Sequence, residues 1–557
     1  MKLNGAQIIV KLLERQGIGI VAGIPGGANL PLYDALSQSS IRHVLARHEQ
    51  GAGFIAQGMA RVSGRPAVCL ATSGPGATNA LTAIADAKLD SVPVVCITGQ
   101  VPRSMIGTDA FQEVDTYGMS IPITKHNYLV RSVQELLEVI PAAFRIAMSG
   151  RPGPVLVDVP KDVQAELLEF DAWPEPATAD ALPVFDREAV GVAARMINES
   201  KHPILYLGGG VANPVAAPRA LALAEKAAIP MTTTLMALGA IPANHPLALG
   251  MLGMHAARYT NLALEECDLL IAVGARFDDR ATGKVAAFCP DAAVIHIDID
   301  DSEIGKIRAA NIGILGDAAE VLDVLLPMIE RNERREWAQR IATLKAEHPM
   351  AMPGAGDTRT PYGLVRHAAR FAGNDAIVAT DVGQHQMWTA QAYPFTRTRQ
   401  WLTSGGLGTM GFGLPAAIGA ALAAPERTVL CFSGDGSILM NIQELATLAE
   451  ENLNVKVILF NNNSLGLVRQ QQQLFYGNRI YASDYRKQVD FMALAKGFGI
   501  AACDLAAEDD PTDALAQALK ANGPCLIHAP IDPAANVFPI VPPGAANREM
   551  IEGNVNA

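Results

Sequence analysis

Cysteine is scarce in this sequence, and its spacing excludes the common cysteine-based sites. The 557 residues contain seven cysteines, and no two form a Cys-x-x-Cys pair of the kind that binds zinc or exchanges disulfides. Cys69, Cys96 and Cys431 lie within apolar, strand-like runs. We therefore expect buried free thiols, as is typical of proteins in a reducing cytosol.

The sequence also lacks a membrane span and a secretory leader. No apolar run reaches the roughly 18 residues that a membrane-spanning helix needs. Near the N-terminus, Ile8, Ile9, Leu12 and Leu13 are separated by charged residues. This pattern predicts an amphipathic helix rather than the apolar centre of a signal peptide. We expect a cytoplasmic protein with no membrane partner.

Positive charge is in deficit. The chain has 44 Lys and Arg against 56 Asp and Glu, which gives a net charge of −12. Binding to a nucleic-acid backbone requires clustered basic residues, so we expect no nucleic-acid partner. Small anionic ligands remain compatible with this charge, because backbone amides and helix N-termini can bind them.

What the sequence does contain is a series of short apolar runs separated by helix-length stretches. Such runs are typical of strands buried on both faces of a parallel sheet. At 557 residues the chain exceeds what one core usually serves, so we predict an α/β protein with three doubly wound parallel-sheet domains. The predicted strands are Pro66–Ala71, Pro93–Thr98, Val155–Val159, Ile204–Leu207, Leu269–Val273, Ala293–Ile299, Ala376–Ala379, Thr428–Phe432 and Val455–Phe460.

Two breaks in composition divide this series. Phe170–Phe185 is rich in Pro, Ala and Asp, and His348–Pro361 contains Pro353, Gly354, Gly356 and Pro361. Both segments are typical of linkers. The predicted domains are therefore residues 1–165, 186–345 and 360–540.

The most informative motif lies in the third predicted domain. The strand that ends at Phe432 leads into Gly434-Asp435-Gly436, and the strand that ends at Phe460 leads into Asn461-Asn462-Asn463. We expect one helix, Ile438–Glu450, between them. Parallel strands end at the same edge of a sheet, so Asp435 and Asn462 can face one another although they are 27 positions apart.

One carboxylate and one amide oxygen suit a magnesium ion whose other ligands are phosphate oxygens. The glycines beside Asp435 allow the backbone to approach a diphosphate closely. The alternative is that Gly-Asp-Gly forms a turn and Asn-Asn a loop. The two motifs at this spacing resemble the magnesium and thiamin-diphosphate motif, and by that resemblance the main-chain oxygen of Ser464 completes the metal site.

A second glycine-rich stretch has a competing interpretation. Gly406–Gly411 matches the dinucleotide fingerprint Gly-x-Gly-x-x-Gly. However, Trp401–Gly405 is a poor strand, and we expect Phe412–Pro415 to interrupt the following helix. We therefore reject a dinucleotide site here.

Glu49 is the candidate for a proton relay. It follows the apolar run Val44–Ala46 and precedes the small-residue segment Gly51–Ala56. Thiamin chemistry needs a carboxyl group that forms a hydrogen bond with the aminopyrimidine ring of the cofactor. Such a carboxyl group should lie in an apolar pocket. The alternative role is an ordinary carboxylate at a helix N-terminus, favoured by the helix dipole.

Six further motifs are spread along the chain. Together with the features above they resemble the acetohydroxyacid synthases (acetolactate synthases), and above all the catalytic subunits of the bacterial isozyme I branch. The similarity runs nearly end to end. The motifs are Gly23–Gly27, Arg47–Ala52, Ser73–Asn79, Gly150–Val155, Gly274–Arg280 and Asp381–Trp388.

The resemblance implies three cofactors: thiamin diphosphate, Mg²⁺ and FAD. Glu49 would be the catalytic proton relay, and Met410 would hold thiamin diphosphate in its bent form. Magnesium would bind Asp435, Asn462 and Ser464. The implied thiamin-diphosphate site comprises Pro25, Glu49, Gly383, Gln384, His385, Gly408, Met410, Gly434, Asp435, Gly436, Ser437, Asn462 and Gly466.

The implied flavin site lies in the middle domain, with one arginine from the first. Because carboligation involves no net redox change, the flavin would be largely structural. The alternative for Gly208–Gly210 is a simple turn after a strand. The implied FAD residues are Arg151, Gly208, Gly253, Met254, His255, Gly274, Arg276, Asp278, Arg280, Asp298, Ile299 and Asp317.

The implied reaction decarboxylates pyruvate and joins its two-carbon unit to pyruvate or 2-oxobutyrate. Arg276 would bind the carboxylate of the second 2-oxo acid, with Phe111, Gln112 and Lys161 nearby. Gln471 stands where several isozymes have a Trp that packs against the extra methyl group. Burial of one methylene is worth about 0.8 kcal/mol, so we predict a weak preference for 2-oxobutyrate.

The family also implies partners. The first domain of one subunit faces the third domain of another, so the minimal active unit would be a homodimer. A small regulatory subunit usually accompanies it. The rival functions are glyoxylate carboligase, which has an apolar residue at the position of Glu49, pyruvate oxidase, and a catalytically silent relative, which should have lost Glu49, Asp435 or Asn462.

Overall fold

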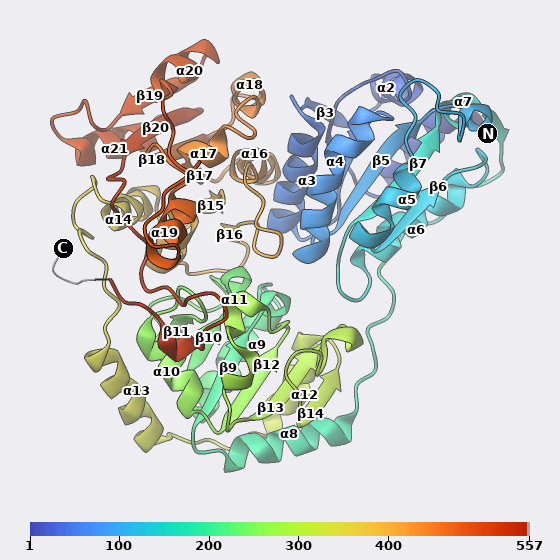
Figure 1. The fold of residues 1–557 in the computed structure, drawn as a ribbon. Helices are drawn as coiled ribbons and strands as arrows, with labels where there is room; N and C mark the ends of the chain where they lie inside the picture. The colour runs from blue at the N-terminus through green and yellow to red at the C-terminus, as the bar shows by residue number, and fades with distance from the viewer. Residues whose placement is uncertain (554–557) are drawn as a thin grey trace.

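The chain folds into three lobes, each built on a six-stranded parallel sheet (Figure 1). The computed structural model describes residues 1–553. Helices pack against the sheets, and the central strands of each sheet are apolar and almost entirely buried. The prediction of an α/β protein with three parallel sheets is confirmed.

The N-terminal lobe begins with the predicted amphipathic helix, α1. Asn4 caps this helix: its side-chain oxygen accepts a hydrogen bond from the backbone of Gln7 (2.8 Å), and the Gln7 side chain accepts one from the backbone of Asn4 (3.1 Å). The short strand β1 (Lys2–Asn4) pairs with β8 (Leu167–Glu169). In sheet order the strands of the lobe are β3 (Arg42–Leu45), β2 (Ile20–Gly23), β4 (Ala67–Ala71), β5 (Val94–Gln100), β7 (Val155–Pro160) and β6 (His126–Leu129). Its helices are α1 (Gly5–Arg15), α2 (Leu30–Leu36), α3 (Glu49–Ser63), α4 (Pro75–Leu89), α5 (Thr116–Ser120), α6 (Leu136–Met148) and α7 (Lys161–Ala165).

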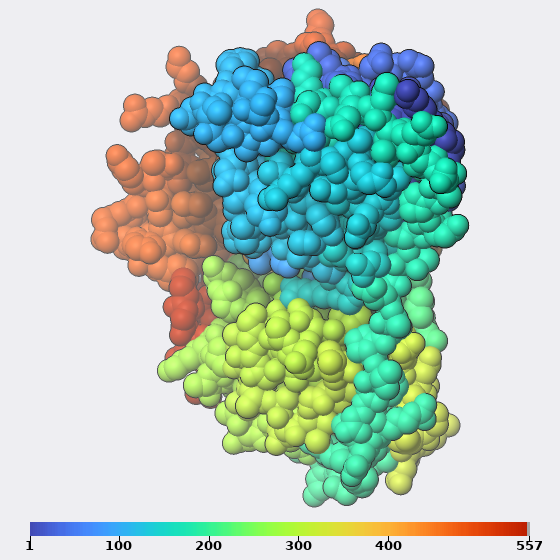
Figure 2. Space-filling view, turned by 90° about the vertical axis from the view of Figure 1, so that its right-hand side faces the viewer, coloured from blue at the N-terminus to red at the C-terminus, as the bar shows by residue number. Residues whose placement is uncertain are grey.

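The central lobe follows a segment without helix or strand that joins it to the first lobe (Figure 1). In the view of Figure 2 the N-terminal lobe, in blue and cyan, lies above the central lobe, in green and yellow. In sheet order its strands are β11 (Ala248–Met251), β10 (Met231–Thr233), β9 (Pro203–Leu207), β12 (Leu269–Val273), β13 (Ala293–Asp298) and β14 (Ile312–Leu315). Its helices are α8 (Arg187–Glu199), α9 (Ala216–Ala227), α10 (Arg258–Glu266), α11 (Asp279–Thr282), α12 (Ala318–Met328) and α13 (Arg335–Glu347).

The C-terminal lobe has the third sheet, and its last described segment returns to the central lobe (Figure 1). There the backbone N–H of Val541 donates to the carbonyl of Met254 (3.0 Å). In sheet order the strands are β16 (Trp401–Leu402), β15 (Ile377–Thr380), β17 (Val429–Gly434), β18 (Val455–Asn461), β20 (Cys525–Pro530) and β19 (Ala501–Asp504). The helices are α14 (Pro361–Ala372), α15 (Gln384–Ala392), α16 (Gly413–Ala423), α17 (Asp435–Ile438), α18 (Glu444–Glu450), α19 (Gly466–Phe475), α20 (Phe491–Gly497) and α21 (Pro511–Lys520).

The N-terminal and C-terminal lobes share one hydrophobic core, because α3 packs directly against α16. Glycines allow the two backbones to approach. A Cβ on Gly58 would lie 2.1 Å from the carbonyl oxygen of Ala416, and one on Gly419 would lie 2.0 Å from that of Ile55. The close helix contact therefore fixes how the two lobes sit relative to each other.

Two local expectations were wrong. The single helix expected over Ile438–Glu450 is divided: α17 ends at Ile438 and α18 begins at Glu444. Between them Asn441 is buried and donates a hydrogen bond to the carbonyl of Gly411 (2.7 Å), a contact that draws the chain away from helical geometry. Pro415 does not interrupt a helix, because it lies in the first turn of α16, where a proline is tolerated.

All seven cysteines are free, and Cys503 is the only one of them that is not fully buried. Among residues 1–553, no helix is long and apolar enough to cross a membrane.

Candidate functional site

A cavity opens at the carboxyl edge of the C-terminal sheet, and it unites most of the predicted cofactor residues. Strands β17 and β18 are neighbours in parallel register, with Gly434 opposite Phe460. Asp435 and Asn462 therefore leave the sheet side by side, as the spacing argument predicts. The predicted residues that line the cavity are Gly383, Gln384, His385, Met410, Gly434, Asp435, Gly436, Ser437, Asn462, Ser464 and Gly466.

Asp435 is a buried carboxyl group at the base of this cavity. Its exposed fraction is 4%. Burial raises the pKa of Asp435 to about 7, although backbone N–H groups of Gly436 and Ser464 favour its ionised form. A cation bound beside the carboxylate would favour ionisation in the same way, so the site suits a metal ion.

Asn462 presents its oxygen rather than its nitrogen. The amide nitrogen donates to the side-chain oxygen of Gln384 (3.0 Å), and the Ser464 hydroxyl donates to the Asn462 oxygen (3.1 Å). Gly466 is required behind this pair, because a Cβ there would lie 2.1 Å from the Gln384 oxygen. Carboxylate, amide and main-chain oxygens are ligands that magnesium accepts, so the residues present fit this ion.

His385 supplies an unpartnered polar atom to the same cavity. Its Nε2 is buried and has no hydrogen-bond partner among the described residues. Burial lowers the pKa of His385 to about 3, so the imidazole is neutral at physiological pH. Gly383 and Gly434 flank the ring, and a Cβ on either would lie within 3.0 Å of it. In the tautomer that carries its proton on Nε2, this orphan nitrogen in a glycine-walled cradle would donate a hydrogen bond to a phosphate oxygen.

Met410 reaches the cavity from the glycine loop, which we define as residues 404–411. Gly408 lies in this loop with a φ of +70°, outside the set of residues that line the cavity. Just after Met410, the backbone N–H of Gly411 donates to Asp381 (2.7 Å). Asp381 is fully buried, and burial raises its pKa to about 6. The loop is thus anchored to the C-terminal lobe directly beside Met410.

Glu49 lies outside the cavity of its own chain. No residue of the N-terminal lobe lines that cavity, and neither Pro25 nor Glu49 reaches it. Glu49 is the first residue of α3, and its carboxylate accepts a hydrogen bond from the Asn79 side chain (3.0 Å). The chain alone therefore does not bring the proton-relay candidate to the metal-binding candidates.

Sequence reasoning missed Glu444, which holds the turn before Glu49. The buried Glu444 carboxylate accepts hydrogen bonds from the backbone N–H groups of Arg47 (2.9 Å) and His48 (3.0 Å). Gly51 makes room for it, since a Cβ there would lie 2.3 Å from the Glu444 oxygen. Glu444 is on α18, so no local pattern links it to a turn almost 400 positions away. A glutamate on the buried face of its helix was the only available signal.

The predicted substrate residues come from all three lobes, and none of them lines the cavity at Asp435 and Asn462. Phe111 is an exposed aromatic side chain, 87% accessible, beside Gln112, whose φ is +59°. Lys161 begins α7, and Gln471 lies on α19. Arg276 makes no side-chain hydrogen bond or ion pair within residues 1–553.

The central lobe has the strand order of a dinucleotide-binding sheet. Counted from its first strand, the order β11-β10-β9-β12-β13-β14 reads 3-2-1-4-5-6, and the switch point lies between β9 and β12. Gly208 and Gly274 follow these two strands. A Cβ on Gly208 would lie 2.0 Å from the Gly274 carbonyl oxygen, so the crevice admits only glycine there.

The other predicted flavin residues surround the same edge. Gly253, Asp298 and Asp317 lie at or just beyond the ends of β11, β13 and β14, with Met254, His255 and Ile299 beside them, while Asp278 caps α11, which contains Arg280. Burial raises the pKa of Asp298 to about 6. The buried Phe277, between Arg276 and Asp278, has a φ of +57°. Such strain in a bulky residue is typical of functional sites.

Arg151 crosses from the N-terminal lobe to this edge. Its guanidinium donates to Glu303 (2.8 Å) and Asp300 (3.2 Å), and also to the Ser91 hydroxyl (2.8 Å). The residues present therefore fit an elongated dinucleotide: a glycine-walled switch point, acidic groups at the strand ends and a basic residue at the rim.

Comparison with known proteins agrees with this architecture. Three domain models of thiamine pyrophosphate enzymes match the chain: the N-terminal TPP binding domain over residues 3–119, the central domain over 190–325 and the C-terminal TPP binding domain over 381–529. The acetolactate synthase isozyme 1 large subunit of Escherichia coli K12 is 61% identical over 99% of this chain and 98% of that protein.

More distant relatives also match along their length. The isozyme 2 large subunit of the same bacterium is 48% identical, over 99% of this chain and 100% of that protein. Chloroplastic acetolactate synthase 1 of Nicotiana tabacum is 44% identical, over 98% of this chain and 85% of that protein. The chain belongs to the acetolactate synthase large subunits, within the family of thiamine pyrophosphate enzymes.

Proposed function

We propose that this chain is the catalytic subunit of an acetolactate synthase. It takes two pyruvate molecules to 2-acetolactate and carbon dioxide, or pyruvate and 2-oxobutyrate to 2-aceto-2-hydroxybutyrate, in branched-chain amino acid biosynthesis. The observation that carries the proposal is the cavity where Asp435, Asn462 and the orphan Nε2 of His385 converge. When bound, thiamin diphosphate supplies the electron sink for decarboxylation and carbon–carbon bond formation.

In this proposal the C-terminal lobe holds the diphosphate end of the cofactor through magnesium. Asp435, the Asn462 amide oxygen and the Ser464 main-chain oxygen bind the ion. Gly383, Gln384, His385, Gly434, Gly436, Ser437 and Gly466 surround the diphosphate, and Met410 with Gly408 supports the bend of the cofactor.

A second copy of the chain completes the site. Glu49 and Pro25 lie outside the cavity of their own chain, although the pyrimidine end of the cofactor needs a carboxyl group. A homodimer that places the N-terminal lobe of one subunit over the C-terminal lobe of the other meets this need. Glu49 then holds a proton at the aminopyrimidine ring.

Arg276 is proposed to bind the carboxylate of the acceptor acid. Its guanidinium is uncommitted among the described residues, and a planar, permanently charged fork suits a carboxylate. Phe111, Gln112 and Lys161 come from the partner in the dimer, and Gln471 lies beside the acceptor. Gln471 gives only a weak preference for 2-oxobutyrate, so a competition assay in which aceto-hydroxybutyrate strongly predominates would contradict it.

FAD is proposed to occupy the carboxyl edge of the central sheet in a largely structural role, held by Arg151, Gly208, Gly253, Met254, His255, Gly274, Arg276, Asp278, Arg280, Asp298, Ile299 and Asp317. The strand order and the glycine contact at Gly208 support this assignment. A yellow preparation is expected. A colourless, fully active preparation would contradict it.

The remaining assignments concern organisation. We propose domains at residues 1–165, 186–345 and 360–540, a cytoplasmic location, and a separate small subunit, since the relatives are named as large subunits.

An assay of acetolactate from pyruvate, with and without thiamin diphosphate and Mg²⁺, tests the function. Activity should require both and should be lost in Glu49→Ala. Peroxide formation in place of acetolactate would favour a pyruvate oxidase, and condensation of glyoxylate would favour a glyoxylate carboligase. Absence of all three activities, with cofactor bound, would favour a silent relative.

A further inference from the structure

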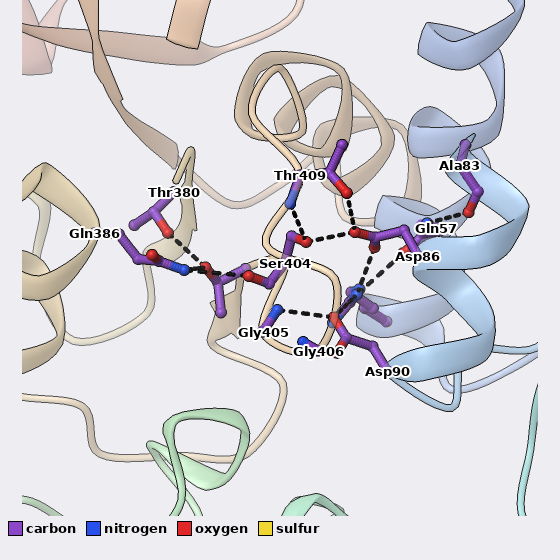
Figure 3. Close-up of polar contacts among 12 residues, drawn as sticks. Gln57, Ala83, Asp86, Asp90, Thr380, Gln386, Ser404, Gly405, Gly406 and Thr409 are labelled. Atoms are coloured by element: carbon purple, nitrogen blue, oxygen red, sulfur yellow. Dashed lines mark hydrogen bonds and ion pairs between the residues drawn. The ribbon is translucent and has the colours of Figure 1, made fainter. Parts of the chain in front are cut away.

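A buried group of charged side chains lies where the N-terminal lobe meets the glycine loop (Figure 3). We define the interlobe cluster as Arg61 on α3 with Asp86 and Asp90 on α4. Both aspartate side chains are fully buried, and that of Arg61 is 10% exposed. The guanidinium donates to Asp90 (2.8 Å) and lies 3.7 Å from Asp86. Two carboxylates thus share one cation, and further donors must offset the second negative charge.

Those donors come from the glycine loop of the C-terminal lobe. The hydroxyl groups of Ser404 and Thr409 both donate to one oxygen of Asp86, the latter over 2.8 Å. The backbone N–H groups of Gly405 (3.1 Å) and Gly406 (2.7 Å) donate to Asp90. Figure 3 shows these contacts reaching from the loop to α4.

The same contacts close the loop on itself. The backbone N–H of Thr409 donates to the Ser404 hydroxyl (2.8 Å), so both ends of residues 404–409 meet at Asp86. The start of the loop is also tied to the C-terminal lobe, where Gln386 donates to the Ser404 carbonyl (3.2 Å). Arg61 additionally lies over the ring of Phe412, 5.1 Å from its centroid. The N-terminal lobe therefore holds the chain on both sides of Met410.

Met410 immediately follows Thr409 and is the residue of this loop that lines the cofactor cavity. Its backbone has an anchor on each side: Asp86 through Thr409, and Asp381 through Gly411. One anchor belongs to the N-terminal lobe and the other to the C-terminal lobe. The position of Met410 thus depends on how the two lobes pack.

We propose that Asp86, supported by Asp90 and Arg61, is a positioning residue that sets Met410 in the cofactor cavity through Thr409. This inference rests on the proposed function, in which Met410 contacts thiamin diphosphate. Arg61 is on the same helix as Glu49, twelve positions later, which corresponds to about 18 Å along the helix axis. In the proposed dimer, α3 therefore connects the Glu49 that serves one cofactor with the loop that serves the other.

Burial and the neighbouring Asp90 raise the pKa of Asp86 to about 6. Arg61, Ser404 and Thr409 act in the opposite direction and lower this pKa. The loop hydroxyls thus help to keep this carboxylate ionised, and their loss weakens the anchor. A hydrogen bond to a charged group is worth more than one between neutral groups.

Thr409→Val tests the proposal, because it removes the hydroxyl group and keeps the side-chain volume. Thiamin-diphosphate affinity at saturating Mg²⁺ and kcat at saturating cofactor should each fall by about tenfold. Thr409→Ser, which keeps the donor, should restore both to within about twofold. Thr260→Val is the matched control: its buried hydroxyl donates to Leu249 (2.6 Å) in the central lobe, and its loss should lower stability without changing affinity or kcat.

Asp86→Asn provides a second test. If the two side chains act through one anchor, the double variant Asp86→Asn/Thr409→Val should lose little more than Asp86→Asn alone. Wild-type affinity and kcat in Thr409→Val, or losses that simply add in the double variant, would overturn the proposal. The binding measurement separates this failure from failure of the proposed function, because cofactor affinity does not depend on which product forms.

Discussion

The N-terminal and C-terminal sheets have the same strand order and different chemistry at their edges. Counted from the first strand of each sheet, both orders read 2-1-3-4-6-5. In the C-terminal lobe the third and fourth strands lead into Asp435 and Asn462, which line a cavity. In the N-terminal lobe the second strand, β3, leads to Glu49, which does not line that cavity. In the proposed dimer, one topology thus supplies two complementary halves of a site, and the residues that follow the strands decide which half each becomes.

The largest expected effect comes from removing the metal-binding half. Asp435→Ala should weaken Mg²⁺-dependent binding of thiamin diphosphate by at least about 100-fold, because loss of a metal ligand exceeds the loss from its supporting contacts. Isothermal calorimetry at fixed Mg²⁺ measures this. Asp509→Ala, which removes an exposed carboxylate from the same lobe, should bind normally. Normal binding by Asp435→Ala would refute the metal assignment.

The two halves can be separated by complementation. Glu49→Gln should retain cofactor binding and lose most activity, because the amide cannot relay a proton. Mixing it with Asp435→Ala subunits, under conditions that allow exchange, should restore about a quarter of wild-type activity. Random pairing makes half of the dimers mixed, and each mixed dimer has one intact site of two. No recovery despite demonstrated subunit exchange would contradict a shared site.

The packing between the two lobes can be disturbed without changing a residue of either half of the proposed site. Gly58→Ala places a Cβ 2.1 Å from the backbone of Ala416, so α3 and α16 must separate. The free energy of unfolding should fall by about 1–3 kcal/mol. In contrast, Gly191→Ala on α8 enters open space and should be neutral or stabilising by up to about 1 kcal/mol. Urea denaturation of both variants provides the measurement, and equal stabilities would argue against tight interlobe packing.

The last contrast concerns the pH dependence of stability. Asp158 on β7 is fully buried, and burial raises its pKa from 3.8 to about 7. The folded chain binds this proton more tightly than the unfolded chain, so its contribution is complete below pH 4 and is lost as pH rises towards 7. Asp158→Asn should reduce the pH dependence of the free energy of unfolding by at most about 1.4 kcal/mol per pH unit. The control Asp171→Asn, at an exposed position, should leave that dependence as it is in the wild type. Denaturation midpoints from pH 4 to 7 test it, and parallel curves would contradict it.

Much of this arrangement could be predicted from local patterns. The apolar runs identified the buried strands, and the positions of Asp435 and Asn462 just after two of them placed both side chains at one edge. The prediction of one helix over Ile438–Glu450 was wrong because the Asn441 side chain forms a hydrogen bond with the carbonyl of Gly411, 30 positions earlier. No periodicity in the sequence reports such a contact.

The sequence by itself determined the three parallel sheets and the meeting of Asp435 with Asn462, because these follow from the period of apolar residues and the direction of parallel strands. Only the tertiary structure decided that Glu444 holds the turn before Glu49 and that Asp86 holds the glycine loop. Both contacts depend on α3 packing against α16, which brings together segments hundreds of positions apart. Glycines allow that approach, but their partners become evident only once the chain has folded.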